Sequence, residues 1–155
     1  QFGERGMDKS GIKLIATGDV TDDDQLNDMG DVALGIVNSH HYSAAHPSAV
    51  NKKFVQAFEQ ANHFRPNFMA VAAYDGMHVI YNALAATKGN GGGDALLAAM
   101  KGQIFESPRG QILIDAQTRD IVQDVYIRKV EKQNGQLWNV EFDVSKAVKD
   151  PGKEK

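Results

Sequence analysis

The sequence contains no cysteine. This absence excludes thiol catalysis and cysteine-based metal sites, although it leaves the cellular compartment open. Apolar runs long enough for a membrane span, about 18 residues, are also missing, so we expect no transmembrane anchor in these residues. The net charge of −3 and the lack of a basic patch argue against nucleic acid as a partner. With 42% hydrophobic and 24% charged residues, the 155-residue chain can form one domain with a real core.

The longest apolar segment with helical spacing covers residues 68–84. Met69, Ala73, Met77 and Ile80 recur at intervals of three and four, as the side chains on one helix face do. Pro66 precedes the segment and Asn67 is a suitable N-cap, so the sequence predicts a helix over residues 67–86. A helix that is apolar around most of its circumference needs cover on nearly every side.

The preceding segments favour an α/β arrangement. Residues 12–17 form a short apolar run before Gly18, which predicts a buried strand. A loop crowded with carboxylates follows at residues 19–24, and a second strand is expected over residues 32–38. Residues 51–62 then have the pattern of an amphipathic helix. This order of strands and helices indicates a layered α/β fold.

The C-terminal part has a different character. A helix is expected from Asp94 to Met100 and a strand over residues 111–115. Two β-rich runs, residues 125–130 and 137–142, flank Asn134-Gly135, a dipeptide that favours a tight hairpin turn. The sequence therefore predicts a C-terminal β-hairpin.

Several blocks of sequence resemble the C-terminal half of a periplasmic solute-binding protein of the leucine/isoleucine/valine-binding type, the type I binding proteins of ABC importers. The blocks are KLIATGD at residues 13–19, ALGIV at 33–37 leading into HHY at 40–42, NKKF at 51–54, RPN at 65–67, AYDG at 73–76, FESPRG at 105–110, TRD at 118–120 and QDVYI at 123–127. Their order and spacing cover almost the whole chain. Members of this family have chains about twice as long as this one.

The resemblance implies a fragment of a two-lobed α/β fold with parallel-sheet lobes and a C-terminal β-hairpin. A small solute binds between the lobes, and hinge closure around it creates the shape that a membrane permease recognises. On this interpretation residues 1–40 belong to the second lobe, and residues 41–121, with the helix at 67–86, belong to the first. Residues 122–155 return to the second lobe with the hairpin and tail.

The resemblance also suggests ligand-binding residues. After the first strand, Asp19, Val20 and Thr21 stand where the family contacts its ligand, and the absence of a Glu there leaves recognition of an α-amino group in doubt. His41 and Tyr42 lie at the expected crossing between lobes, where either could donate a hydrogen bond to a carboxylate. Further candidates at or near the start of the long helix are Phe68, Met69 and Tyr74. For each candidate, packing or solvent exposure is the alternative interpretation.

The expected solute carries a carboxylate. A branched-chain or other amino acid is the family default, and an aromatic or other organic acid is the alternative. The other expected partner is the membrane permease of an ABC importer, with location in the periplasm. No enzymatic activity, cofactor or metal is expected, since three nearby histidines lack acidic support at suitable spacing.

Two other functions remain as alternatives. The acidic loop at residues 19–24 could bind a divalent cation in a metal-dependent hydrolase, although no catalytic motif accompanies it. A sensor domain of the same fold is the third possibility. Finally, the long helix would lack cover in a chain of this length, so we expect the chain to self-associate.

Overall fold

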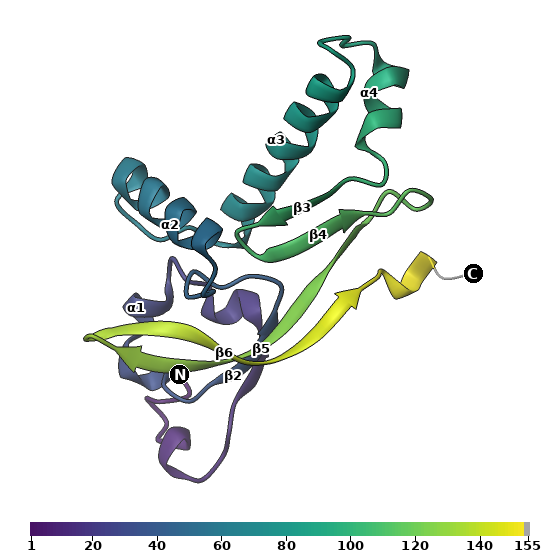
Figure 1. The fold of residues 1–155 in the computed structure, drawn as a ribbon. Helices are drawn as coiled ribbons and strands as arrows, with labels where there is room; N and C mark the ends of the chain where they lie inside the picture. The colour runs from purple at the N-terminus through teal and green to yellow at the C-terminus, as the bar shows by residue number, and fades with distance from the viewer. Residues whose placement is uncertain (154–155) are drawn as a thin grey trace.

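The computed structural model describes residues 1–153 and contains one six-stranded sheet with four helices packed around it (Figure 1). The strands lie in the order β1-β2-β5-β4-β3, and β6 pairs with β5. The strands are β1 (Ile15–Thr17), β2 (Val37–His40), β3 (Ile104–Ser107), β4 (Gly110–Ile114), β5 (Ile121–Gln133) and β6 (Gln136–Val148). The helices are α1 (Leu26–Met29), α2 (Ala49–Asn62), α3 (Phe68–Ala86) and α4 (Gly93–Met100). The mixed α/β class expected from the sequence is confirmed.

The sheet is parallel at one end and antiparallel elsewhere. β1 and β2 run parallel, with Thr17 opposite Ser39. The strand expected over residues 12–17 is shorter than predicted, and it is not buried, since Ile15 is 81% exposed. In contrast, β2, β3, β4 and β6 each join the sheet through antiparallel pairs. The start of β5 pairs with β4, whereas the rest pairs with β2 and β6. Strand β5 therefore connects the two ends of the molecule.

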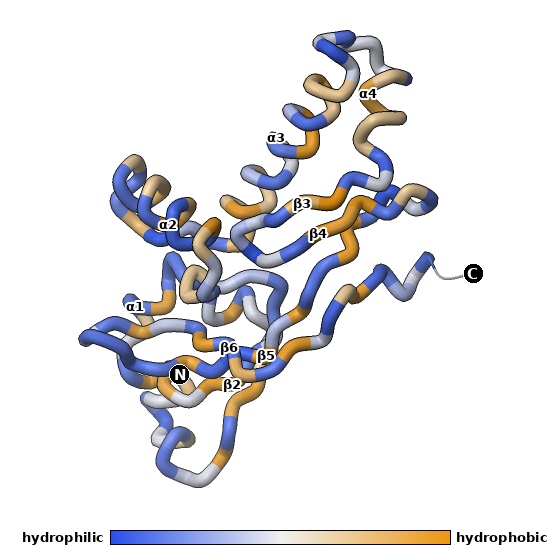
Figure 2. Tube along the Cα trace, viewed as in Figure 1, coloured by the Kyte–Doolittle hydropathy of each residue, from blue (hydrophilic) through white to orange (hydrophobic). Residues whose placement is uncertain are grey.

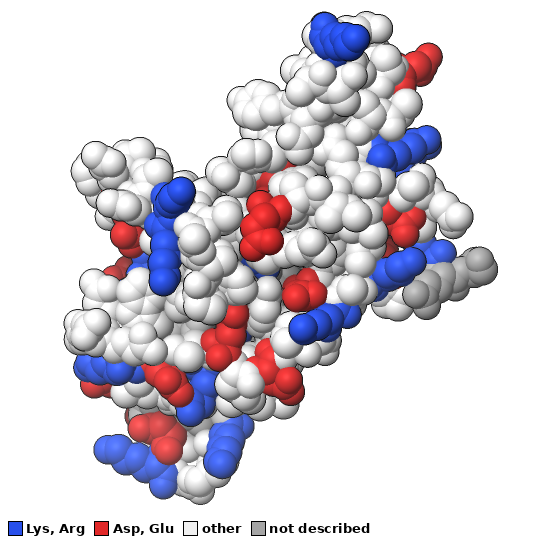
Figure 3. Space-filling view, in the orientation of Figure 1, with Lys and Arg blue, Asp and Glu red and all other residues white. Residues whose placement is uncertain are grey.

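Figure 1 shows two groups of elements joined by the long β5–β6 ribbon. Helices α2, α3 and α4 lie with β3 and β4 in the upper group, and β1, β2 and α1 lie with the hairpin in the lower group. The chain passes between them after β2 and again along β5. Charged side chains of both signs are interspersed on the face shown in Figure 3. None of the helices within residues 1–153 is long and apolar enough to cross a membrane.

Helix α3 starts and ends where the sequence predicts. The Asn67 side chain caps its N-terminus by accepting a hydrogen bond from the Ala70 N–H at 3.0 Å. Only Val71, Asp75 and Ala83 are buried along its 19 residues. Met69 is 65% exposed and Tyr81 is 57% exposed, although apolar residues recur along the helix (Figure 2). The full cover that we expected for this helix is therefore absent within the described residues.

The hydrophobic core of the lower group lies between α1 and the hairpin. It contains Leu26, Ala33, Ile36, Val130 and Leu137. The strand expected over residues 32–38 is wrong in its first half, because a 3₁₀ turn covers Gly30–Ala33 and the strand starts at Val37. Gly30 and Gly35 have φ angles of 69° and 79°, which are incompatible with an extended strand.

The hairpin is confirmed and is longer than predicted. Asn134 and Gly135 both have positive φ, 51° and 83°, as a type I′ turn requires. Leu137 and Asn139 face the interior, and Trp138 is half-buried between them in sequence. Phe142, further along the same strand, is 61% exposed.

Candidate functional site

Three aromatic rings gather where the parallel strands end. His40 closes β2, His41 follows it, and Phe68 is the first residue of α3. The ring centroids lie 4.3 Å apart for His40 and His41, 5.0 Å for His40 and Phe68, and 6.0 Å for His41 and Phe68. We call these three residues the ring cluster. Ligands of open α/β sheets bind beyond the carboxyl ends of parallel strands, which is where the ring cluster lies.

The backbone after β1 packs directly against the ring cluster. Gly18 opens the 3₁₀ turn Gly18–Thr21, and a Cβ atom at Gly18 would lie 2.2 Å from His40 Cδ2 and 2.5 Å from Arg128 Nη2. Real Cβ atoms do not approach other heavy atoms so closely, so a larger residue here would displace His40 or Arg128. Because Gly18 has no side chain, the turn can pack directly against the imidazole of His40.

Arg128 holds the framework beneath the ring cluster. Its guanidinium donates to Asn38 Oδ1 at 2.7 Å, to the backbone carbonyl of Tyr42 and to the carbonyl of Gly18 at 3.3 Å. The side chain is only 1% exposed. One residue of β5 thus fixes the ends of both parallel strands.

The two imidazoles are uncharged at neutral pH. Burial lowers the pKa of His40 to about 4, and the charge of Arg128 acts in the same direction. Burial also lowers the pKa of His41 to about 3, with further contributions from His40 and Arg109. Each ring therefore offers one N–H donor and one nitrogen acceptor.

The acidic loop is largely buried. Asp23 is 1% exposed, accepts from the Ala44 N–H at 2.9 Å, and accepts from Asn139 Nδ2 at 3.2 Å. Burial raises the pKa of Asp22 to about 6 and raises the pKa of Asp23 as well. Within this loop Asp22 and Asp23 are therefore buried, whereas Asp19 is exposed. No group of three or more candidate metal ligands occurs among the residues described.

The predicted site residues divide into three sets. Asp19 and Val20 lie exposed on the turn beside the ring cluster, and a hydrogen bond from the Thr17 side chain lowers the pKa of Asp19. Thr21 is fully buried, and its hydroxyl lies 3.3 Å from Asn139 Oδ1. Tyr42 is 1% exposed, and its hydroxyl donates to Asn51 Oδ1 at 3.1 Å. Thr21 and Tyr42 are therefore buried and bonded to other residues of the protein, and neither faces solvent in this structure.

The candidates on α3 also differ in their surroundings. Phe68 belongs to the ring cluster, and its neighbour Met69 is exposed. Tyr74 instead packs against Phe54 and His78, with ring centroids 5.0 Å and 4.3 Å away. It lines a groove beside α2. The next residue, Asp75, forms a 2.8 Å ion pair with Arg109.

The site residues predicted from the sequence include neither Arg128 nor His40. The available signal for Arg128 was its position in β5, where Tyr126, Arg128 and Val130 alternate onto one face. All three are buried. A charged residue at a buried position of a strand indicates a paired or hydrogen-bonded role.

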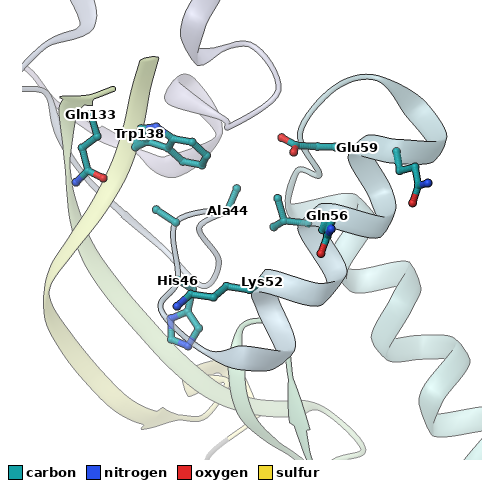
Figure 4. A pocket seen from close by; sticks show the side chains of 10 residues that line it. Ala44, His46, Lys52, Gln56, Glu59, Gln133 and Trp138 are labelled. Atoms are coloured by element: carbon teal, nitrogen blue, oxygen red, sulfur yellow. The ribbon is translucent and has the colours of Figure 1, made fainter. Parts of the chain in front are cut away.

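A separate groove of about 630 Å³ lies between α2 and the hairpin (Figure 4). In Figure 4 the side chains of Gln56 and Glu59 come from α2, and Trp138 and Gln133 come from the hairpin. Its lining residues are Ala44, Ala45, His46, Lys52, Val55, Gln56, Glu59, Gln60, Gln133 and Trp138. None of the ring cluster residues lines this groove.

Comparison with known proteins identifies a matching family and relatives that are described as binding proteins. The sequence profile of a family described as periplasmic binding protein matches residues 1–136. Leu/Ile/Val-binding protein homolog 6 of Brucella abortus is 40% identical over 152 residues, which cover 96% of this chain and 39% of the relative. The chain thus spans about two-fifths of the length of the curated relatives that it matches.

Solved structures agree with this assignment. A solute-binding protein of an ABC transporter from Rhodopseudomonas palustris BisB5, in complex with 3,4-dihydroxybenzoic acid, is 62% identical. It superposes with a TM-score of 0.95 over 98% of this chain and 42% of that one. A second, from R. palustris HaA2 in complex with p-hydroxybenzoic acid, is 40% identical with a TM-score of 0.89, over 99% and 42% of the two chains. Since the family profile covers most of its residues and the fold agrees, the chain belongs to the periplasmic binding protein family.

Proposed function

We propose that this chain is part of the solute-binding component of an ABC importer and binds its solute beside the ring cluster. The observation that carries the proposal is the set of three rings at the carboxyl ends of β1 and β2. Membership of the family and the printed descriptions of the solved relatives support it. The parent protein would deliver the solute to a membrane permease from the periplasm.

The two groups of elements in Figure 1 correspond to parts of two lobes in this proposal. Residues 1–40 and 122–155 contribute to one lobe, and residues 41–121 contribute to the other. The ring cluster then receives its imidazoles from the crossing segment and its phenyl ring from the first lobe. Asp19 and Val20 lie beside the ring cluster, on the turn after β1. Closure of the lobes would bring these groups together around the solute.

The proposed solute is an aromatic carboxylic acid. Aromatic side chains bind flat rings through offset or edge contacts, and the ring cluster contains both a tilted and an edge-on pair of rings. The relative that is 62% identical was solved with 3,4-dihydroxybenzoic acid. An amino acid is the alternative, because the Brucella relative bears a leucine/isoleucine/valine name. The exposed carboxylate of Asp19 favours that alternative, since it could pair with an α-amino group.

A thermal-shift screen of the full-length parent protein distinguishes these solutes. The screen would compare benzoate and hydroxybenzoates with leucine, valine and phenylalanine. A ligand present at 100 times its Kd stabilises the folded state by about 2.7 kcal/mol, which gives a clear rise in Tm. We expect the rise for the aromatic acids. A rise only for aliphatic amino acids would contradict the aromatic assignment, and no rise for any organic acid would contradict the binding function.

A further inference from the structure

The imidazoles of His40 and His41 have no hydrogen-bond partner among residues 1–153. Nδ1 of His40 is buried, and both residues are partly buried. Polar atoms in such partly enclosed positions normally have partners, because an unsatisfied donor or acceptor costs free energy. The ring cluster therefore presents unused hydrogen-bonding capacity directly beside an aromatic surface.

The numbers of hydrogen-bond donors and acceptors on the two imidazoles indicate which chemical group of a ligand they could bind. Because both rings are neutral, the pair carries two N–H donors and two nitrogen acceptors, one of these four nitrogens, His40 Nδ1, being buried. A carboxylate accepts hydrogen bonds but donates none, so it leaves the nitrogen acceptors unpaired. A phenolic hydroxyl donates one hydrogen bond and accepts others, and it matches a neutral imidazole pair on both counts.

The neighbouring cations point to the same conclusion. The positive charges that act on the two histidines belong to Arg109 and Arg128. Arg109 is 4% exposed and is paired with Asp75 and Gln123. Arg128 is 1% exposed and donates to three acceptors in the framework. Neither guanidinium is free to bind a carboxylate at this end of the site.

The positions of the imidazoles are constrained on several sides. Gly18 packs against His40, Phe68 lies against both rings, and Arg128 fixes the backbone carbonyls on either side. Two neutral imidazoles held in fixed positions can discriminate between ligands by where the ligand carries its hydrogen-bond donor and acceptor. Flexible surface histidines would give little such discrimination.

We propose that His40 and His41 recognise ring hydroxyl groups, so that the site selects phenolic acids over unsubstituted benzoate. The proposal rests on the proposed function and adds the specificity of the ring cluster. The carboxylate of the solute would be bound by other groups in the cleft. His40 and His41 are specificity-determining residues in this account, and Phe68 packs against the aromatic ring of the solute.

Calorimetric titration of the full-length parent protein tests the proposal. The ligands are benzoate, 4-hydroxybenzoate and 3,4-dihydroxybenzoate, and the variants are His41→Phe and His40→Phe. Each substitution keeps an aromatic ring and removes both nitrogens. For the native protein we expect the hydroxylated acids to bind at least about tenfold more tightly than benzoate, because benzoate leaves the imidazole nitrogens without a hydrogen-bond partner.

In His41→Phe this preference should fall to within about threefold, while the Kd of benzoate stays nearly unchanged. His78→Phe is the matched control, because His78 packs on Tyr74 and Phe105 outside the ring cluster and should retain the native preference. Should His40→Phe fail to fold, since Gly18 leaves little room, His41→Phe decides alone. An unchanged preference in His41→Phe, or an equal loss for all three acids, would overturn the proposal while leaving aromatic binding intact. No binding of any of the three acids to the native protein would overturn the proposed function as well.

Discussion

Asp22 is a buried carboxylate whose ionisation at neutral pH opposes the stability of the folded chain. Its side chain is 7% exposed, and burial raises its pKa to about 6 from the usual value of 3.8. The folded state therefore keeps a proton up to about pH 6, whereas the unfolded chain releases it near pH 4. The contribution of Asp22 to the free energy of unfolding is fully present below about pH 4 and is lost as the pH rises through 6.

Replacing Asp22 by Asn should reveal this cost. Asn keeps the oxygen that accepts from the Asp23 N–H at 2.9 Å but carries no charge. At pH 7–8 we expect Asp22→Asn to be more stable by about 1–3 kcal/mol, because each unit of pKa shift corresponds to about 1.4 kcal/mol. Near pH 3.5 the variant and native chains should unfold at the same denaturant concentration. A variant that is less stable than the native chain at pH 8 would show that the Asp22 charge stabilises the fold.

Arg65 connects the loop between α2 and α3 to the hairpin. It donates to the Leu137 carbonyl at 2.6 Å and to Gln136 Oε1 at 2.7 Å, and its guanidinium lies 3.3 Å from the ring centroid of Trp138. The side chain is 6% exposed. This contact joins the upper and lower groups of elements at a point away from the β5–β6 ribbon.

Removing the guanidinium should destabilise the chain. We expect Arg65→Ala to lower the free energy of unfolding by about 2–3 kcal/mol, since it removes charged hydrogen bonds and a cation–π contact. Arg65→Lys keeps the charge but not the planar fork, so it should lose about half as much. Urea denaturation followed by Trp138 fluorescence measures both. Identical midpoints for all three proteins would mean that the contact contributes nothing in solution.

The geometry of the hairpin turn depends on two adjacent residues, Asn134 and Gly135. Asn134 and Gly135 both occupy the left-handed region. Gly135→Val should cost about 1–2 kcal/mol, because a β-branched residue at positive φ is strained. Asn134→Gly keeps the required conformation and should cost less than about 0.5 kcal/mol. Equal losses for the two variants in a chemical denaturation series would count against the type I′ assignment.

Local signals explain which elements could be predicted from the sequence. The Asn-Gly turn, the Asn67 cap and the apolar period of α3 each act over a few residues, and the corresponding elements are confirmed. The strand near residue 35 was placed too early because the conformation of Gly35 depends on its tertiary surroundings. In the structure the Gly35 N–H donates to the Val130 carbonyl.

The site was harder to predict because it depends on contacts between distant segments. Arg128 reaches carbonyls 86 and 110 residues away in the chain, and Asn139 bonds to Thr21 across 118 residues. No short-range pattern reports such partners. The resemblance pointed to the turn at Asp19, to His41 and to the helix start at Phe68, but it could not show that Thr21 and Tyr42 are buried.

At the scale of the whole molecule, the 155-residue chain leaves an apolar surface along α3 and β3. Met69, Tyr81 and Ile104 are 65%, 57% and 61% exposed. Large exposed apolar surfaces favour association. We therefore predict that the chain alone forms dimers or larger assemblies at micromolar concentration, as light scattering after size exclusion would show.

A charged double variant, Met77→Lys with Tyr81→Lys, provides the comparison. The two residues lie one helical turn apart and are both exposed, at 43% and 57%, so the variant should shift the chain toward monomer without unfolding it. A native chain that is monomeric and unfolds cooperatively would contradict the prediction. That result would mean that the exposed face of α3 is compatible with a stable monomer.

The central claim is that the ring cluster forms the binding site for an aromatic acid. Calorimetric titration of the full-length parent protein and its Phe68→Ala variant with 4-hydroxybenzoate tests it most directly, with leucine as the second ligand. We predict saturable binding of 4-hydroxybenzoate to the native protein and at least about tenfold weaker binding to Phe68→Ala, because the variant loses an aromatic packing partner. Both proteins should retain a cooperative unfolding transition. Equal affinity of the two proteins for 4-hydroxybenzoate, or tight binding of leucine in its place, would contradict the claim.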